Sequence, residues 1–121
     1  MSSATAAGPF RKLSVLIPCY NEWPTIGEIV DRVREVQTGL DLEIIVVDDG
    51  STDGTRHVVE ELAAQGKIRA FYLPQNRGKG AAVQRALREA TGDIVLIQDA
   101  DLEYDPADYP TLLRPILTGR A

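Results

Sequence analysis

The stretch Asp93-Ile-Val-Leu-Ile-Gln-Asp-Ala-Asp-Leu-Glu-Tyr-Asp-Pro106 decides the fold, because in it an apolar run ends abruptly in acidic residues. Residues 94–97 are aliphatic and uncharged, which is typical of a strand covered on both faces. Asp99 and Asp101 follow this strand, and open α/β sheets bind ligands outside the carboxyl ends of their strands. Asp105 and Pro106 instead predict a helix start, with Asp at the N-cap and proline at the first helical position.

The spacing of Asp99 and Asp101, with one small residue between them, indicates a cation site. Two carboxylates held this close repel each other unless a positive charge lies between them. Mg²⁺ and Mn²⁺ take oxygen ligands and often bridge one or two carboxylates to the phosphate oxygens of a substrate. A solvated turn is the simpler interpretation of the same residues, but the paired acids favour a divalent metal.

The composition is that of a soluble globular protein, with 121 residues, 44% hydrophobic and 26% charged. This length allows one domain or part of one, and we expect a flexible N-terminus over residues 1–11 and a single domain over 12–121. A net charge of -5 argues against a nucleic-acid polymer as partner. One cysteine excludes a disulfide framework, and no apolar run approaches the roughly 18 residues of a membrane span.

Hydrophobic periodicity predicts four strands separated by helical segments. The expected strands cover 12–18, 42–48, 67–73 and 94–97, and Pro18 is expected to end the first because proline cannot donate to a ladder. The third helix is expected to begin at Gly78 and to turn Val83, Ala86, Leu87 and Ala90 inward. Alternating strands and helices with right-handed crossovers predict an α/β fold with a doubly wound, mostly parallel, Rossmann-like sheet.

Such a sheet brings the loops after the first, second and fourth strands to one edge. Tyr20 and Glu22 follow the first strand, Asp48 and Asp49 end the second, and Asp99 and Asp101 follow the fourth. Tyr20 fits either a wall on which a nucleotide base stacks or ordinary packing. Asp48 and Asp49 fit either acceptors for a base or ribose, or a turn before a helix.

The stretch Asn76-Arg-Gly-Lys-Gly-Ala81 is expected to open a helix at a point that favours anions. It is neither a Walker loop nor a dinucleotide fingerprint, because Leu73, Gly80 and Val83 stand where those motifs need other residues. We predict that Asn76 and Lys79 contact the nucleotide, with Lys79 on a phosphate. A solvated lysine in a glycine turn fits the residues equally well.

Four motifs in order resemble family 2 glycosyltransferases of the GT-A fold, and within them the dolichyl- or polyprenyl-phosphate sugar synthases. They are Val15-Leu-Ile-Pro-Cys-Tyr-Asn-Glu22, Val46-Val-Asp-Asp-Gly-Ser-Thr-Asp-Gly-Thr55, Asn76-Arg-Gly-Lys-Gly-Ala81 and Gln98-Asp-Ala-Asp-Leu-Glu-Tyr-Asp-Pro106. Together they cover about residues 12–110. Several motifs in the right order are far more specific than any one of them.

The resemblance implies a nucleotide-diphospho-sugar donor, such as GDP-mannose or a UDP-sugar, and Mg²⁺ or Mn²⁺ at an Asp-x-Asp site. Asp99 and Asp101 match the metal-binding acids, and Glu103 falls where polyprenyl-phosphate members place a further ligand, often Gln. The positions that match the family's nucleotide contacts are Pro18, Tyr20, Asn21, Glu22 and Asp49, with Asp48 beside them.

The implied reaction is an inverting displacement in which an acceptor oxygen attacks the anomeric carbon of the sugar. The expected acceptor is a polyprenyl or dolichyl phosphate, which is already ionised and needs no strong general base. The resemblance also implies a missing acceptor half, peripheral membrane contact of the full-length protein at the cytoplasmic face, and self-association through exposed apolar surface. Two alternatives stay open: a nucleotide-binding fragment without catalysis, and a phosphoacceptor receiver domain.

Overall fold

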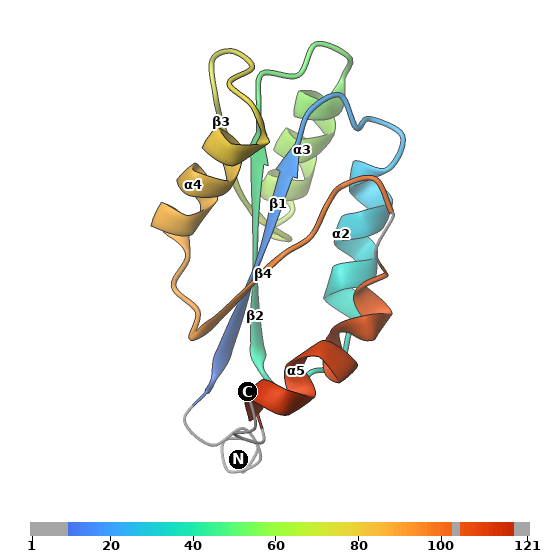
Figure 1. Ribbon diagram of the computed structural model, residues 1–121. Coiled ribbons are helices and arrows are strands. Elements are labelled where there is room, and N and C mark those ends of the chain that lie inside the picture. The colour runs from blue at the N-terminus through green and yellow to red at the C-terminus, as the bar shows by residue number, and fades with distance from the viewer. Residues whose placement is uncertain (1–9, 103–104, 118–121) are drawn as a thin grey trace.

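The computed structural model describes residues 10–102 and 105–117, which form a parallel sheet flanked by helices (Figure 1). The elements in chain order are β1 (Lys12–Cys19), α2 (Ile26–Glu35), β2 (Asp41–Asp48), α3 (Thr55–Ala64), β3 (Arg69–Tyr72), α4 (Lys79–Glu89), β4 (Ile94–Ile97), the 3₁₀ helix η1 (Pro106–Asp108) and α5 (Tyr109–Leu117). The strand order is β3-β2-β1-β4 and every pairing is parallel. The doubly wound parallel sheet predicted from the sequence is confirmed.

The order of the strands reverses between β1 and β4. The chain steps from β1 to β2 to β3 in one direction and then returns to place β4 on the other side of β1. Helices α2, α3 and α5 cover one face of the sheet, and α4 alone among the described helices covers the other (Figure 1). A reversal of this kind leaves a crevice at the carboxyl ends of the two diverging strands.

Strand β1 is the centre of the core, with every residue from Leu13 to Cys19 buried. Its odd-numbered side chains pack against α2, α3 and α5 in the larger of two apolar clusters. On the other face, Leu16 packs in a smaller cluster with Ala82 and Ala86 of α4. These two small residues let α4 lie close to the sheet. The prediction that Leu87 faces the sheet is wrong, because Leu87 is 47% exposed.

Pro18 lies inside β1 and not at its end as predicted. The carbonyls of Lys12 and Leu16 both accept hydrogen bonds from the β4 side. Alternate residues of a strand face the same neighbour, so the backbone nitrogen of position 18 also faces that side. Because the pairing of β1 with β4 ends at Leu16, the missing N–H of Pro18 leaves no ladder bond unmade.

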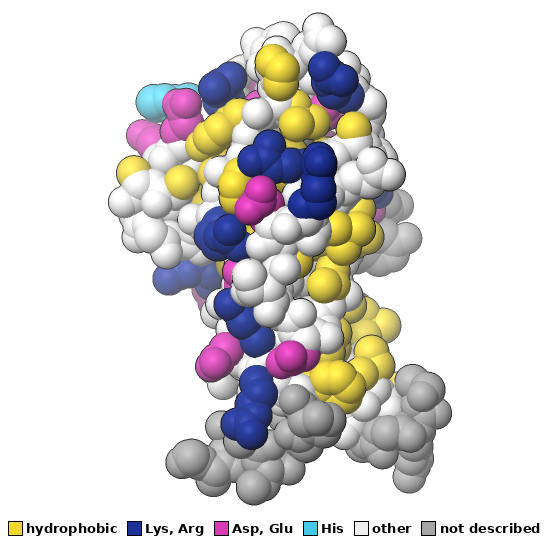
Figure 2. Space-filling model, turned by 90° about the vertical axis from the view of Figure 1, so that its left-hand side faces the viewer, with side chains coloured by type: hydrophobic (Ala, Val, Ile, Leu, Met, Phe, Trp, Pro, Cys, Tyr) yellow, Lys and Arg dark blue, Asp and Glu magenta, His cyan; other side chains and the backbone are white. Residues whose placement is uncertain are grey.

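Apolar side chains are exposed where β4 forms an edge of the sheet. Ile97 is paired with Leu16 and therefore faces the α4 side, yet it is 53% exposed. Val95 on the same face and Leu87 on α4 are exposed as well. Figure 2 shows hydrophobic side chains on this side of the molecule, among lysine and arginine side chains. These exposed side chains agree with the apolar surface expected from the sequence. Self-association through this surface stays a prediction.

The segment just before β1 is anchored to the domain, in part through the residue that precedes β4. Phe10 packs against the larger cluster, and the Arg11 N–H donates to the Asp93 carboxylate at 2.8 Å. The last two residues of the expected flexible terminus therefore contact the domain.

The predicted helix start at Asp105 is confirmed, because its carboxylate accepts from the Ala107 N–H at 2.9 Å ahead of Pro106. Within the described ranges, no helix is long and apolar enough to cross a membrane.

Glu43 ties the strands together at the amino end of the sheet, opposite the crevice. Its buried carboxylate accepts from the Ser14 hydroxyl at 2.6 Å, from the Thr91 N–H at 2.9 Å and from the Arg69 guanidinium at 3.0 Å. Burial alone would raise the pKa of Glu43, but these hydrogen bonds outweigh it and lower the pKa to about 2. One carboxylate therefore links β1, β2, β3 and the segment that leads into β4.

We predict that Glu43→Gln lowers the free energy of unfolding by about 2 kcal/mol at pH 7, because the variant loses charge-assisted hydrogen bonds. The folded-state pKa of about 2 lies below the usual 4.5, so this stabilisation is present above pH 4.5 and is lost as the pH falls toward 2. Urea unfolding followed by circular dichroism at pH 7 and pH 3 measures the difference, which should shrink at pH 3. Glu28→Gln, in an exposed pair with Arg32, is the control and should change little.

Candidate functional site

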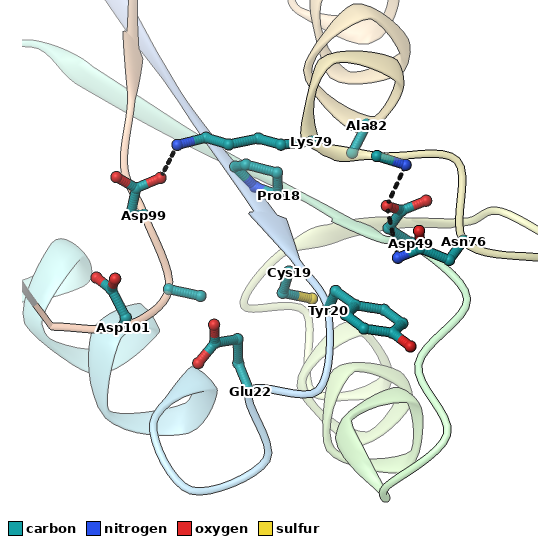
Figure 3. Close-up of a pocket in the computed structure, with 12 residues that line it drawn as sticks. Pro18, Cys19, Tyr20, Glu22, Asp49, Asn76, Lys79, Ala82, Asp99 and Asp101 are labelled. Atoms are coloured by element: carbon teal, nitrogen blue, oxygen red, sulfur yellow. Dashed lines mark hydrogen bonds and ion pairs between the residues drawn. The ribbon is translucent and has the colours of Figure 1, made fainter.

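A cavity of about 440 Å³ opens at the carboxyl ends of the strands, in the crevice between β1 and β4. Its lining residues come from the end of β1, from the segments that follow β1, β2, β3 and β4, and from the start of α4 (Figure 3). They are Pro18, Cys19, Tyr20, Glu22, Asp49, Asn76, Gly78, Lys79, Ala82, Asp99, Ala100 and Asp101. The structure therefore brings together most of the site residues predicted from the sequence.

One end of the cavity is acidic. Glu22, Asp99 and Asp101 lie at this end, and the ammonium of Lys79 forms an ion pair with Asp99 (Figure 3). Burial, followed by the negative charge of Asp101, raises the pKa of Glu22. Carboxylates that repel one another in this way form a ready site for a cation.

The turn that carries Asp99 and Asp101 is held by side chains that the sequence analysis did not assign to the site. The buried Gln98 accepts from the Tyr109 hydroxyl at 2.6 Å and donates its amide to the Asp99 carbonyl at 3.2 Å. The Thr25 hydroxyl donates to the Ala100 carbonyl at 2.5 Å. The start of α2 and the start of α5 thus position the acidic turn, and no sequence spacing signals these contacts.

The other end of the cavity holds Tyr20, Asp49 and Asn76 (Figure 3). The Tyr20 ring is 43% exposed, which leaves surface on which a planar group can stack. Asp49 is buried, and its carboxylate accepts from the N–H groups of Arg77 at 2.8 Å and Gly78 at 2.9 Å and from the Asn76 amide at 3.2 Å. In this structure Asp49 therefore holds the amino end of α4 against the end of β2.

Gly50 allows the loop after β2 to lie directly against the segment 75–78. Its φ of 74° is in the left-handed region, and a Cβ at this position would lie 2.5 Å from the Asn76 nitrogen. Any other residue would push the 75–78 segment away from Asp49. The glycine that follows the acidic pair thus sets the position of Lys79, the first residue of α4.

Asn21 and Asp48 do not line the cavity, although both were predicted as nucleotide contacts. The Asn21 side chain accepts from the Thr52 N–H at 2.8 Å, and the Asn21 N–H donates to the Ser51 hydroxyl at 2.9 Å. Asp48 is fully buried and accepts from the Ser51 N–H at 3.3 Å. Both side chains connect the loop after β1 to the loop after β2, and their contact with a nucleotide stays a prediction.

Cys19 lines the cavity as well, but its surroundings do not suit a nucleophile. The thiol is buried and lies 4.0 Å from an Asp48 carboxylate oxygen. Burial and the negative charge of Asp48 raise the pKa of the thiol far above its ordinary value. The reactive thiolate is therefore disfavoured, as expected for a cysteine that packs as a small apolar residue.

The acidic end fits a hard divalent cation that is shared with a ligand. Asp99 and Asp101 offer carboxylate oxygens, which Mg²⁺ and Mn²⁺ prefer. The predicted third ligand, Glu103, lies outside the described residues. Among residues 10–102 and 105–117, no group of three or more His, Cys, Asp or Glu side chains is arranged to hold a metal ion. The remaining ligands would then come from water and from phosphate oxygens.

A doubly wound parallel sheet with paired carboxylates and a lysine at its switch point belongs to the class of α/β domains that bind ligands at the carboxyl ends of their strands. Within this class the chain belongs to glycosyl transferase family 2, whose model matches residues 14–121. The family resemblance read from the four motifs is confirmed. The receiver-domain alternative is wrong, because the family model that matches residues 14–121 is that of a glycosyl transferase.

Similar proteins include a dolichol-phosphate mannosyltransferase of Pyrococcus furiosus, 37% identical over 108 residues, which are 89% of this chain and 31% of that protein. The mannosyltransferase PcManGT from Pyrobaculum calidifontis was solved with GDP-Man and Mn²⁺. Its structure superimposes on this chain with a TM-score of 0.71 and 36% sequence identity, and the match covers 90% of this chain and 32% of PcManGT. The glucosyl-3-phosphoglycerate synthase of Mycobacterium tuberculosis was solved with Mn²⁺, UDP and glucosyl-3-phosphoglycerate. It matches this chain with a TM-score of 0.75 and 34% sequence identity, over 96% of this chain and 43% of the synthase. The chain spans about a third of the length of the curated relatives it matches, and its sheet matches the GT-A fold of the solved structures.

We predict that Asp49→Asn lowers the free energy of unfolding by about 1–3 kcal/mol, because an amide has one acceptor oxygen and leaves an N–H at the start of α4 unsatisfied. Urea unfolding of the parent and the variant measures this difference. Asp31→Asn is the matched control, since Asp31 is exposed on α2 and forms a long ion pair of 3.9 Å with Lys67. Equal stability of Asp49→Asn and the parent would contradict the assigned role of Asp49.

Proposed function

We propose that this chain is the donor-binding part of an inverting glycosyltransferase that uses a nucleotide-diphospho-sugar and Mg²⁺ or Mn²⁺. The observation that carries the proposal is the cavity at the switch point, with an acidic end beside Lys79 and a Tyr20 end beside Asn76. The two ends differ in the way that the two halves of such a donor differ. A planar base suits the exposed ring of Tyr20, and a diphosphate suits a cation at the acids.

The residues of the acidic end would hold the metal, with Asp99 and Asp101 as its protein ligands. The metal, when bound, would supply Lewis-acid stabilisation of the negative charge that develops on the leaving diphosphate. Lys79 lies where its ammonium can contact the same phosphates, at the amino end of α4. Gln98, Thr25 and Tyr109 keep the acidic turn in place, so the protein side of the site is arranged before the donor binds.

We propose an acceptor that carries an ionised phosphate, with polyprenyl or dolichyl phosphate as the first candidate. The proposal is supported by similar proteins named for dolichol phosphate and for glucosyl-3-phosphoglycerate, both of which are phosphate compounds. A phosphate oxygen is ionised at neutral pH and can attack without a strong general base. Among the described residues that line the cavity there is no histidine.

We predict that a nucleoside diphosphate stabilises the chain only when Mn²⁺ or Mg²⁺ is present, by roughly 2.7 kcal/mol at a ligand concentration of about 100 times the Kd. Asp101→Asn should abolish this metal-dependent stabilisation while the fold stays intact, because the substitution relieves repulsion between acids but removes a hard ligand. Differential scanning with UDP and GDP, in Mn²⁺ and in EDTA, measures both effects.

Asp108→Asn is the control for this experiment, because it removes one carboxylate from an exposed position on η1. It should behave as the parent does. Equal stabilisation in EDTA and in Mn²⁺ would contradict the metal bridge, and undiminished binding by Asp101→Asn would remove Asp101 from the site.

We also predict that these 121 residues bind a donor but transfer no sugar at a measurable rate. Transfer requires both reactants to be held in attack geometry, and the proposal assigns the described cavity residues to the donor alone. Radiolabelled GDP-mannose or UDP-glucose, Mn²⁺ and either a short polyprenyl phosphate or 3-phosphoglycerate provide the assay, with a full-length relative as the positive control. Labelled product from this chain alone would show that the prediction is wrong, and the acceptor that yields it would identify the substrate class.

A further inference from the structure

Lys79 brings a positive charge into the acidic end of the cavity before any ligand is bound. It is the first residue of α4, and its ammonium donates to an Asp99 carboxylate oxygen across the crevice (Figure 3). Among the described residues that line the cavity, Lys79 is the only one with a cationic side chain. The cavity therefore contains its own counter-charge to a carboxylate that the proposed function assigns to a metal.

The main chain of Lys79 is held firmly, whereas its side chain can be displaced. Asp49 accepts from the N–H groups of Arg77 and Gly78, immediately before Lys79, and so fixes the amino end of α4. The Lys79 side chain is 59% exposed and that of Asp99 is 27% exposed. An ion pair that water reaches contributes little stability. The Lys79 ammonium can therefore leave Asp99 for another anion at a small cost in free energy.

The four-carbon chain of a lysine allows such an exchange. A compact ammonium on a flexible stem can leave one oxygen ligand for another without moving the backbone. The amino end of a helix also favours an anion near it, which draws a phosphate toward the same place. A diphosphate that enters the cavity would therefore offer Lys79 a second partner close to the first.

We propose that Lys79 competes with the divalent metal for Asp99 while no donor is bound, and moves to the diphosphate when the donor enters. The proposal rests on the proposed function and adds a coupling to it. Free metal must displace a bound lysine from Asp99, whereas metal that arrives with a nucleotide finds Asp99 released. Binding of metal and binding of nucleotide are then mutually favourable, and by linkage each raises the affinity for the other by the same factor.

The test is the affinity for Mn²⁺ alone, and for Mn²⁺ with saturating UDP or GDP, in the parent and in Lys79→Gln. Isothermal titration calorimetry and the electron paramagnetic resonance signal of free Mn²⁺ both measure it without any turnover. Without nucleotide, Lys79→Gln should bind Mn²⁺ more tightly than the parent, by about threefold to tenfold, because a partly screened charge competitor has been removed. The factor by which nucleotide raises Mn²⁺ affinity should fall by the same threefold to tenfold in this variant, because the Mn²⁺ affinity with nucleotide bound should not change.

Two further variants separate this competition from general electrostatics. Arg77→Gln removes the same charge two residues away, from an exposed side chain that does not line the cavity, and should leave both Mn²⁺ affinities near those of the parent. Lys79→Arg keeps the charge at the site and should bind free Mn²⁺ as weakly as the parent does. Circular dichroism and the urea midpoint establish that each variant is folded.

The outcomes distinguish this proposal from the proposed function. If the parent binds Mn²⁺ and nucleotide together but Lys79→Gln has the same free Mn²⁺ affinity and the same coupling factor, the competition is overturned and the donor site stands. If Arg77→Gln changes both quantities as much as Lys79→Gln, the effect is one of net charge and the competition is again overturned. If the parent binds no metal with or without nucleotide, the proposed function and this inference both fail.

Discussion

Strand β1 is the element on which the rest of the structure depends, because it is paired on both edges and buried on both faces. Its neighbours, β2 and β4, belong to opposite directions of winding, so the crevice between their ends lies directly beyond β1. Parallel pairing then forces the carboxyl ends of β1, β2 and β4 to the same edge of the sheet. The cavity residues converge because the parallel register sets Cys19 opposite Asp48 and Leu16 opposite Ile97, so the segments that follow these strands leave the sheet side by side.

The acidic residues of the chain serve two physical roles. Three carboxylates are buried and accept hydrogen bonds from N–H and O–H donors of neighbouring segments: those of Glu43, Asp48 and Asp49. Asp99 and Asp101 are more exposed and face the cavity, where their charges have a lysine and the solvent near them. Burial thus separates the carboxylates that hold loops together from those that the proposed function assigns to a ligand.

The charge of the acidic end explains why a donor and a metal would bind there together. Three carboxylates lie at this end of the cavity, and burial, followed by the negative charge of Asp101, raises the pKa of Glu22. Among the described residues no group of three metal-ligating side chains is found, and under the proposed function phosphate oxygens would supply further ligands. An ion pair between Lys79 and Asp99 lowers the repulsion in the meantime, and it is exposed enough to be exchanged.

The sequence by itself determined the order of the strands and helices, the acidic ends of β2 and β4, and the helix start at Lys79, because periodicity, glycine turns and N-cap residues are local signals. It also determined the family, through four motifs in order. Only the tertiary structure decided that Pro18 is tolerated inside β1, since that depends on where the pairing with β4 ends. The same holds for the roles of Asp49, Gln98 and Thr25 as supports of the site, and for the position of Lys79 against Asp99. These contacts join residues far apart in the chain, and which of them form is set by the packing of α4, α2 and α5 against the sheet.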